Sequence, residues 1–150
     1  MKKLMRKISV FCVITMMIIG MSIPVYAETT LPELGKVVDG SVLTEENVSE
    51  VTLYNRARGN ILNRGIARAS DNGNGSVNAY AAAIGAVTCD RLELTIVLQR
   101  YTGSYWVDVA SRSYSASNVA MLSKSFNTTV TKGYYYRVKA ACVAKDGGAI

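Results

Sequence analysis

Hydrophobic and polar residues change their spacing near residue 60. Before that point the chain has a predominantly apolar run from Ile8 to Met21, followed by a mixed stretch without a steady period. Beyond it, apolar residues alternate with polar ones, most clearly in Leu92–Gln99. A period of two is typical of a half-buried β-strand, whereas an amphipathic helix has a period near 3.6. We therefore expect an all-β domain over 61–150, preceded by a flexible, mostly irregular leader over 28–60.

The alternating part of the chain divides into about six strands. Residues that tolerate positive φ separate two of them in Asp71–Gly75, as a tight hairpin requires. This run is not a calcium loop, because Gly73 and Gly75 stand where oxygen ligands would be needed. Short strands without helices between them predict an antiparallel β-sandwich or a barrel. The strands are expected over 61–68, 76–86, 91–101, 105–112, 119–130 and 133–144.

Residues 1–27 have the three parts of a secretory signal peptide. A basic segment, Met1–Lys7, precedes the apolar run, and Ala27 provides a small residue directly before the expected cleavage point. The alternative is an uncleaved anchor, but Ile8–Ile19 has only 12 residues, whereas a membrane-spanning helix needs about 20. We therefore expect a secreted protein that begins at Glu28 and has no membrane attachment after the signal is removed.

Two weaker patterns lie at the end of the leader and the start of the domain. Thr44 is a candidate cap for one helical turn that would align Val48, Val51 and Tyr54, and a flexible leader is the alternative. Four cations are interpreted as the solvated face of a first strand rather than as an anion site: Arg56, Arg58, Arg64 and Arg68.

Charge and composition exclude several classes of function. The net charge of +6 includes four cations in the signal, so the remainder has 13 basic and 11 acidic residues, a net charge of +2. A charge this small does not predict a nucleic-acid-binding surface. The chain has no His, which removes the commonest general base and the commonest metal ligand, and Cys89 therefore lacks an imidazole partner. We expect no enzyme activity, no catalytic residues, no cofactor and no metal.

Three elements of the domain resemble a known fold. They are Leu92–Tyr101 (LELTIVLQRY), Gly103–Trp106 (GSYW) and Gly133–Ala140 (GYYYRVKA). Their order resembles an immunoglobulin-like or fibronectin type III-like sandwich, and the stretch from about Gly65 to Gly148 is similar to a family of small secreted proteins of Gram-positive bacteria whose function is uncharacterised. The resemblance implies a structural scaffold and brings no catalytic residues with it.

The resemblance also implies neighbours for each strand. The strand over 91–101 should lie beside the strand over 133–144, with Leu94 and Ile96 buried and Val138 packed against them. A further strand would normally follow, but only Lys145–Ile150 remain. Three alternatives stay open: the final strand is missing, the leader lies beside the strand over 133–144, or the open edge pairs with a strand from a partner.

A disulfide bond between Cys89 and Cys142 is expected. These are the two cysteines that remain after signal removal, and export makes their oxidation favourable. Pairing of the strand over 91–101 with the strand over 133–144 should bring them together. The alternative is a buried free Cys142 and a loop Cys89.

Aromatic residues provide the main binding hypothesis. Tyr101, Trp106 and Tyr135 are candidates for a ligand platform, unless Tyr134 closes the turn before its strand and Tyr135 serves only cross-strand packing. The sequence therefore predicts a secreted, non-enzymatic binding or adhesion module that acts at the cell surface or in the medium, with a cell-wall glycan or a protein as partner. A secreted effector or antimicrobial-type polypeptide that acts on other cells is the alternative.

Overall fold

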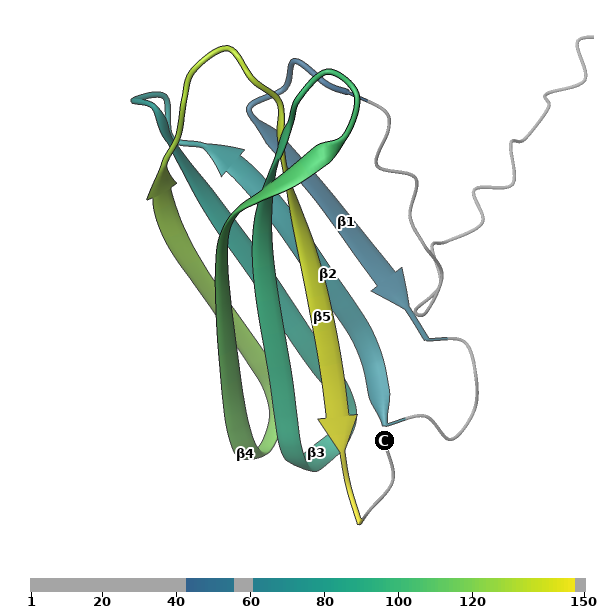
Figure 1. Ribbon diagram of the computed structural model, residues 1–150. Helices are drawn as coiled ribbons and strands as arrows, with labels where there is room; N and C mark the ends of the chain where they lie inside the picture. The colour runs from purple at the N-terminus through teal and green to yellow at the C-terminus, as the bar shows by residue number, and fades with distance from the viewer. Residues whose placement is uncertain (1–42, 56–60, 148–150) are drawn as a thin grey trace, which may run out of the picture. The chain divides into compact units, whose positions relative to one another are not determined.

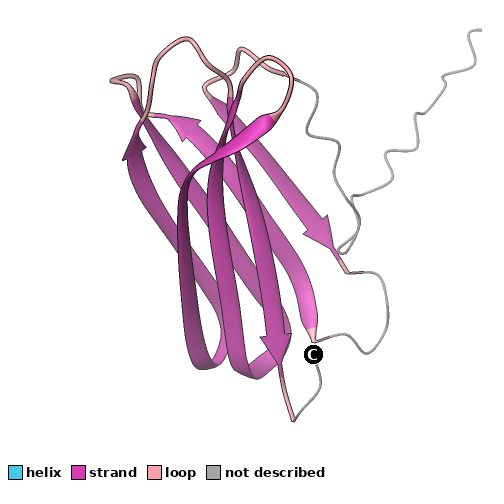
Figure 2. Cartoon of the chain, viewed as in Figure 1, coloured by secondary structure: helices cyan, strands magenta, loops and turns pink. Residues whose placement is uncertain are grey.

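The computed structural model describes residues 43–55 and 61–147, and these residues form an antiparallel β-sheet of five strands without a helix (Figures 1 and 2). The all-β prediction is confirmed. Within the described residues no helix could cross a membrane. The strands are β1 (Val48–Tyr54), β2 (Leu62–Asp71), β3 (Ser76–Tyr101), β4 (Trp106–Thr129) and β5 (Tyr136–Lys145).

β3 and β4 are long strands that take part in two half-sheets. The first half-sheet consists of β1, β2, residues 76–84 of β3 and residues 121–129 of β4. The second consists of residues 106–117 of β4, residues 91–101 of β3, and β5. Both long strands turn at the same end of the molecule, so the sheet folds back over itself (Figure 1).

The bend in β3 depends on Gly85. Strand pairing with β4 is interrupted between Ile84 and Cys89. A Cβ atom on Gly85 would lie 2.6 Å from the Cys89 Sγ and 2.7 Å from the Val87 carbonyl oxygen, so only glycine fits. The matching bend in β4 contains Asn118, whose φ of 55° belongs to a left-handed conformation that Asn tolerates.

The hydrophobic core lies between the two half-sheets. Leu94 and Ile96 are at most 1% exposed, and Val138 packs against the core from β5, so these sequence predictions are confirmed. Ala79, Ala81 and Ala83 of the first half-sheet are completely buried, as their alternation predicts. The buried residues that form one contiguous cluster are Val77, Ala79, Ala81, Ala83, Cys89, Leu92, Leu94, Ile96, Leu98, Leu122 and Ala144.

The predicted turns are present at the end of the molecule opposite the bends. The Asn72 N–H donates to the Ser76 carbonyl oxygen (2.9 Å), and Gly73 and Gly75 have φ values of +79° and +76°. The Thr102 N–H donates to the Tyr105 carbonyl oxygen (2.9 Å), which closes the hairpin between β3 and β4. We call this end, with the segment 130–135 that precedes β5, the hairpin end.

Several expectations need correction. Val48, Val51 and Tyr54 do not share a helical turn, because Val48–Tyr54 is the edge strand β1 paired with β2. The strands expected over 105–112 and 119–130 are two halves of one strand, β4. Residues 1–42, 56–60 and 148–150 lie outside the described residues, and with them the predicted signal peptide, most of the leader, Arg56 and Arg58.

The cations of β2 have the solvated positions expected of them. Arg64 and Arg68 are half-buried. The Arg68 guanidinium lies over the Tyr80 ring, 4.6 Å from its centroid, and its Nη1 is 3.7 Å from the Glu50 carboxylate. These contacts with an acid and an aromatic ring favour a strand face over an anion site.

Candidate functional site

The strongest cluster of chemically distinctive side chains lies on the outer face of the second half-sheet, near the hairpin end. Tyr101 and Trp106 face each other across the hairpin, with ring centroids 5.1 Å apart and planes inclined by 43°. The Arg137 guanidinium of β5 lies 4.3 Å from the Trp106 ring centroid. A cation stacked on an indole ring holds the ring in one orientation.

Two polar residues extend this cluster across three strands. The Gln99 amide donates to the Asp108 carboxylate (2.7 Å) and accepts from the Arg137 Nε–H (2.8 Å). β4, β3 and β5 thus contribute Asp108, Gln99 and Arg137 in one row. We call Tyr101, Trp106, Gln99, Asp108 and Arg137 the outer-face cluster.

A bulge in β4 places Asp108 in this row. The register changes from Leu98 opposite Ala110 to Gln99 opposite Asp108, so Val109 is an extra residue on β4. Such a bulge changes the direction of the side chains of the strand that contains it, here β4. As a result, the carboxylate meets the Gln99 amide beside the aromatic pair.

The ring of Tyr135, the third residue of the predicted platform, makes no described ring contact with Tyr101 or Trp106, so its place in a platform stays a prediction. Its carbonyl oxygen accepts from the Tyr101 N–H (2.9 Å), but its hydroxyl donates to the Glu45 carboxylate. This hydrogen bond and the negative charge of Glu45 raise the pKa of Tyr135. The side chain links the segment before β5 to the segment before β1.

The neighbouring tyrosines have different roles from those expected. The Tyr136 hydroxyl donates to the Thr131 carbonyl oxygen (2.9 Å), so Tyr136 rather than Tyr134 closes the turn before β5. Tyr134 is 49% exposed and lies over the Arg100 guanidinium, 4.8 Å from ring centroid to Cζ. Although Tyr134 has the same parity as the core-facing residues Tyr136 and Val138, it therefore does not face the core.

A pocket of about 520 Å³ opens at the hairpin end. It is lined by the segment before β1, the β2–β3 hairpin and the segment before β5, including the charged residues Glu45, Asp71 and Lys132. Its walls combine turn residues with strand residues, including the buried apolar residues Ala69 and Val77. No buried titratable group of the described residues points to chemistry there.

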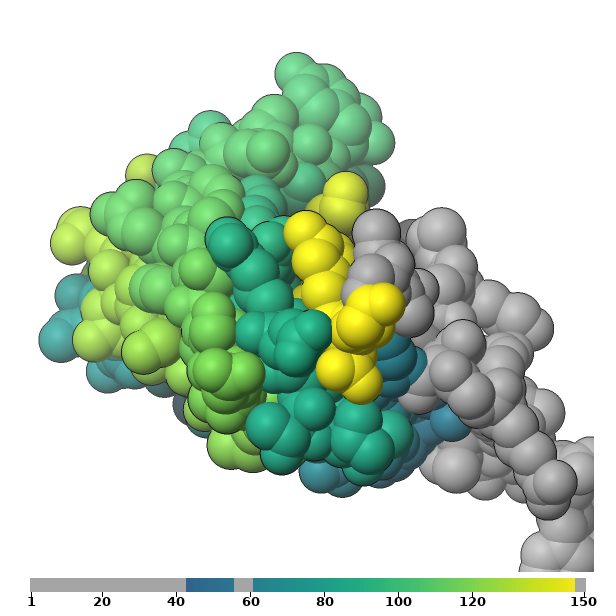
Figure 3. Space-filling model, turned by 90° about the horizontal axis from the view of Figure 1, so that it is seen from below, coloured from purple at the N-terminus to yellow at the C-terminus, as the bar shows by residue number. Residues whose placement is uncertain are grey.

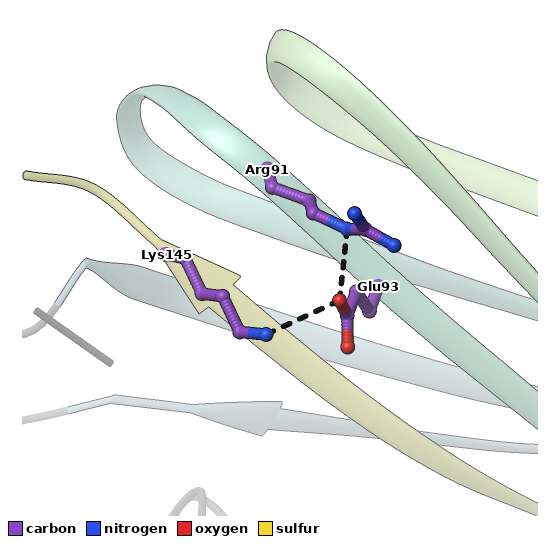
Figure 4. A network of polar contacts seen from close by, with 3 residues as sticks. All are labelled: Arg91, Glu93 and Lys145. Atoms are coloured by element: carbon purple, nitrogen blue, oxygen red, sulfur yellow. Dashed lines mark hydrogen bonds and ion pairs between the residues drawn. The ribbon is translucent and has the colours of Figure 1, made fainter. Parts of the chain in front are cut away.

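An ion network occupies the same outer face near the bend end (Figure 4). The Glu93 carboxylate is 2.8 Å from the Arg91 Nε and 3.3 Å from the Lys145 Nζ. One acid therefore serves two cations, and the network carries a net positive charge. All three side chains are partly exposed, so the network has a modest effect on stability.

The expected disulfide bond is not present in the structure, where Cys89 and Cys142 are both free. The strand register explains this result. Cys142 lies opposite Leu94, five residues along β3 from Cys89, which lies at the bend opposite Val119. Burial raises the pKa of Cys142 to about 11 and, together with Asp146 and Asp90, raises the pKa of Cys89.

No group of three or more His, Cys, Asp or Glu residues within the described ranges could hold a metal ion. No protein-family model matches the chain, and no curated protein or solved structure is significantly similar to it. The outer-face cluster must therefore be interpreted from its own chemistry.

Sequence reasoning found two of the five members of this cluster. Tyr101 and Trp106 were identified from their aromatic character in one hairpin. Gln99 and Arg137 entered the sequence analysis only as parts of the elements that carry the fold resemblance. The available signal was that both have odd numbers on strands expected to be neighbours, and they are opposite each other on β3 and β5. Only the strand register shows that Arg137 and Asp108 both lie opposite Gln99.

Proposed function

We propose that this protein is a secreted, non-enzymatic binding module with an immunoglobulin-like or fibronectin type III-like sandwich, and that the outer-face cluster binds a sugar of the cell-wall glycan. The observation that carries the proposal is the aromatic pair Tyr101–Trp106 beside the hydrogen-bonded row of Gln99, Asp108 and Arg137.

The strand order supports the fold. β2, residues 76–84 of β3 and residues 121–129 of β4 correspond to the first sheet of a fibronectin type III-like domain, and the second half-sheet to its other sheet without the final strand. The hydrogen bond from Tyr136 to the Thr131 carbonyl resembles the tyrosine corner of such sandwiches. β1 is an additional strand beyond β2.

The chemistry of the cluster supports a sugar ligand. A sugar ring presents C–H groups on its faces and hydroxyl groups around its rim, so it is recognised by an aromatic surface next to planar polar side chains. Tyr101 and Trp106 supply the aromatic surface and are half-buried, which leaves part of each ring accessible. Asp108, Gln99 and Arg137 supply acceptors and donors at the rim.

Their rigidity strengthens this argument. The Arg137 guanidinium is held both by the Trp106 ring and by Gln99, and Gln99 is held by Asp108. Side chains that are already ordered lose little conformational freedom when a ligand binds. The signal-like residues 1–27 support secretion, which would bring this surface to the cell wall.

Binding to purified cell-wall glycan tests the proposal. The full chain should be retained on isolated wall material and released by soluble wall fragments. Trp106→Ala should weaken retention at least about tenfold, because aromatic anchors dominate such interfaces. Tyr105→Ala is the matched control, since Tyr105 is an aromatic residue of the same hairpin, 64% exposed, outside the cluster.

Equal retention of the Trp106→Ala and Tyr105→Ala variants would contradict the proposal. A second variant separates the polar row from the rings: Asp108→Ala should also reduce retention while leaving the core intact. Growth inhibition of other bacteria by the unsubstituted chain, with no wall retention, would favour the effector alternative.

A further inference from the structure

The unpaired edge of β5 is the second surface that needs an explanation. β5 pairs with β3 on one side, and no described strand lies on its other side. Figure 3, seen from the bend end, shows β5 at the surface next to β3. An edge with free N–H and C=O groups is a template for another strand.

The free backbone groups belong to the core-facing residues of β5. The Tyr101 N–H donates to the Tyr135 carbonyl, which identifies Tyr101–Tyr135 as a hydrogen-bonded pair. In an antiparallel ladder such pairs alternate with pairs whose backbone groups point outwards. The N–H and C=O groups of Val138, Ala140 and Cys142 therefore point away from β3.

The burial of the same residues shows that the core is incomplete at this edge. Leu94, Ile96 and Leu98 are at most 1% exposed, whereas the residues opposite them, Cys142, Ala140 and Val138, are only partly buried. In the first half-sheet, Val51 and Leu53 of β1 lie opposite the buried residues Ala67 and Gly65. Val51 and Leu53 face the same way as these partners but are only half-buried.

These two observations describe one vacant strand position. β1 extends the first half-sheet by one strand beyond β2, and the second half-sheet has no strand beyond β5. A strand added to β5 would cover the exposed parts of Val138 and Ala140 and would oppose Val51 and Leu53 across the core. Neighbouring strands lie about 4.8 Å apart, so a single strand fills this position.

We infer that residues 33–42 of the same chain occupy this position as a strand antiparallel to β5. Tyr135, immediately before β5, is hydrogen-bonded to Glu45. The chain therefore enters β1 from the starting end of β5, and the ten residues that precede Leu43 match the ten residues of β5 in length. Coming from the opposite end, they run antiparallel to β5.

One register of the added strand places an acidic residue opposite each of the two lysines of β5. With Val42 opposite Tyr136, Asp39 lies opposite Lys139 and Glu33 opposite Lys145. Lys139 has no acidic side chain within ion-pairing distance among the described residues, and Lys145 shares Glu93 with Arg91. The same register turns Val42, Val38 and Leu34 towards the core. Lys36 takes a core-facing position too, where its long side chain can extend along the edge to water.

A second copy of the chain fits this edge less well. Arg137, Lys139 and Lys145 all lie on the outer face of β5. Pairing of two β5 edges around a two-fold axis would place these cations beside one another, and like charges on neighbouring strands are destabilising. The residues 33–42 instead bring two acids and one cation.

Amide exchange in the full, unsubstituted chain tests the inference. The amides of Val138, Ala140 and Cys142 should exchange slowly, because each donates to the added strand. Lys139→Glu should accelerate their exchange about two- to fivefold, the effect expected for loss of one exposed ion pair, and Asp39→Lys in the same chain should reverse the change. Lys124→Glu on β4 is the control with the same charge change and should leave these amides unaffected. Rapid exchange in the unsubstituted chain would overturn the inference.

A cross-link tests the register and the source of the strand. Asp39 and Lys139 would form a pair without backbone hydrogen bonds, with Cα atoms about 4.5 Å apart, a separation that a disulfide can bridge. In the full chain with its three native cysteines replaced by alanine, Asp39→Cys with Lys139→Cys should form a bond within monomers. Lys36→Cys with Lys139→Cys is the control and should not.

Each other outcome contradicts the inference. A bond between two chains would assign the edge to a second copy. If no disulfide forms and the β5 amides exchange rapidly in the unsubstituted protein, the edge is open and available to a strand of a partner protein. The wall-retention test replaces Trp106, which lies on β4 and not on the β5 edge, and amide exchange does not measure wall retention, so the two proposals can fail independently.

Discussion

The two edges of the folded sheet are built differently. On one side, both half-sheets end at β4, and its core-facing positions include Arg112, opposite Ile96, and Lys124, opposite Ala81. The Arg112 guanidinium lies over Phe126 (5.6 Å) and the Lys124 ammonium over Tyr114 (5.9 Å). On the other side, the core-facing residues of β5 are all uncharged.

This difference shows how side chains can prevent a further strand from pairing with a sheet edge. Along β4, long cationic side chains cover aromatic residues and extend to water, and inward-pointing charges prevent another strand from adding to the edge. Along β5, Val138, Ala140 and Cys142 have no such cover among the described residues. The β4 edge is complete by itself, whereas the β5 edge is complete only with an additional strand.

The largest effect is expected at the centre of the core, midway between the two edges. Ile96 is completely buried, with Arg112 opposite it on β4 and Ala140 opposite it on β5. Ile96→Ala should lower the free energy of unfolding by about 2 to 5 kcal/mol, measured by urea denaturation. A loss within about 0.5 kcal/mol would be typical of a surface position and would contradict the burial.

A lysine on the core-facing side of β5 tests whether the two edges differ. Ala140→Lys gives β5 the kind of residue that β4 has at Lys124. If an added strand covers the β5 edge, the lysine must displace it or be buried, and we expect a loss of about 1 to 3 kcal/mol in the free energy of unfolding. Ala141→Lys, on the exposed outer face, is the control. Equal stability of the two variants would mean that no further strand pairs with either edge.

Removal of a cation from the β4 edge should have a smaller effect. Arg112→Ala and Lys124→Ala each lose one exposed cation–π contact, worth about 0.5 to 1 kcal/mol. They should also increase self-association in sedimentation experiments, since the inward-pointing charge no longer protects the edge. Lys132→Ala, a cation of the segment before β5, serves as the control. Unchanged stability and association would show that these contacts do not close the edge.

The smallest effect concerns reactivity rather than stability. With a pKa of about 11, Cys142 is about 0.1% thiolate at pH 8, and the raised pKa of Cys89 acts in the same direction. Both thiols should react slowly in the folded protein, and the rate should rise with pH. After unfolding without a reductant, Cys89 and Cys142 should both titrate as free thiols. If neither reacts in a monomer, the disulfide predicted from the sequence forms after all.

The strands were predictable because alternation is a local property. Leu92–Leu98 has an apolar residue at every even position, and each of these residues is buried. The Asn and Gly residues of 71–75 predicted their hairpin through their tolerance of positive φ. β1 was missed because Val48, Val51 and Tyr54 have the spacing of a helix, whereas in the strand Val51 and Leu53 share a face, which only pairing with β2 decides.

The candidate site was predictable only in part, for a related reason. Aromatic character alone singled out Tyr101, Trp106 and Tyr135, and it could not show that the Tyr135 hydroxyl donates to Glu45. Arg137 became a member through pairing of β5 with β3, and Asp108 through the bulge at Val109. Neither a register nor a bulge follows from the residue types on a single strand.

The sequence alone determined the all-β class, the hairpin turns at 71–75 and 102–105, and which residues of β3 face the core, because side-chain alternation and turn preferences are properties of short segments. The tertiary structure decided how far the strands slide along one another and where they bend. Cys142 shows the consequence, since the register of β5 places it opposite Leu94 rather than near Cys89. A shift of a few residues costs little in local preference, and the packing of the whole core selects one register.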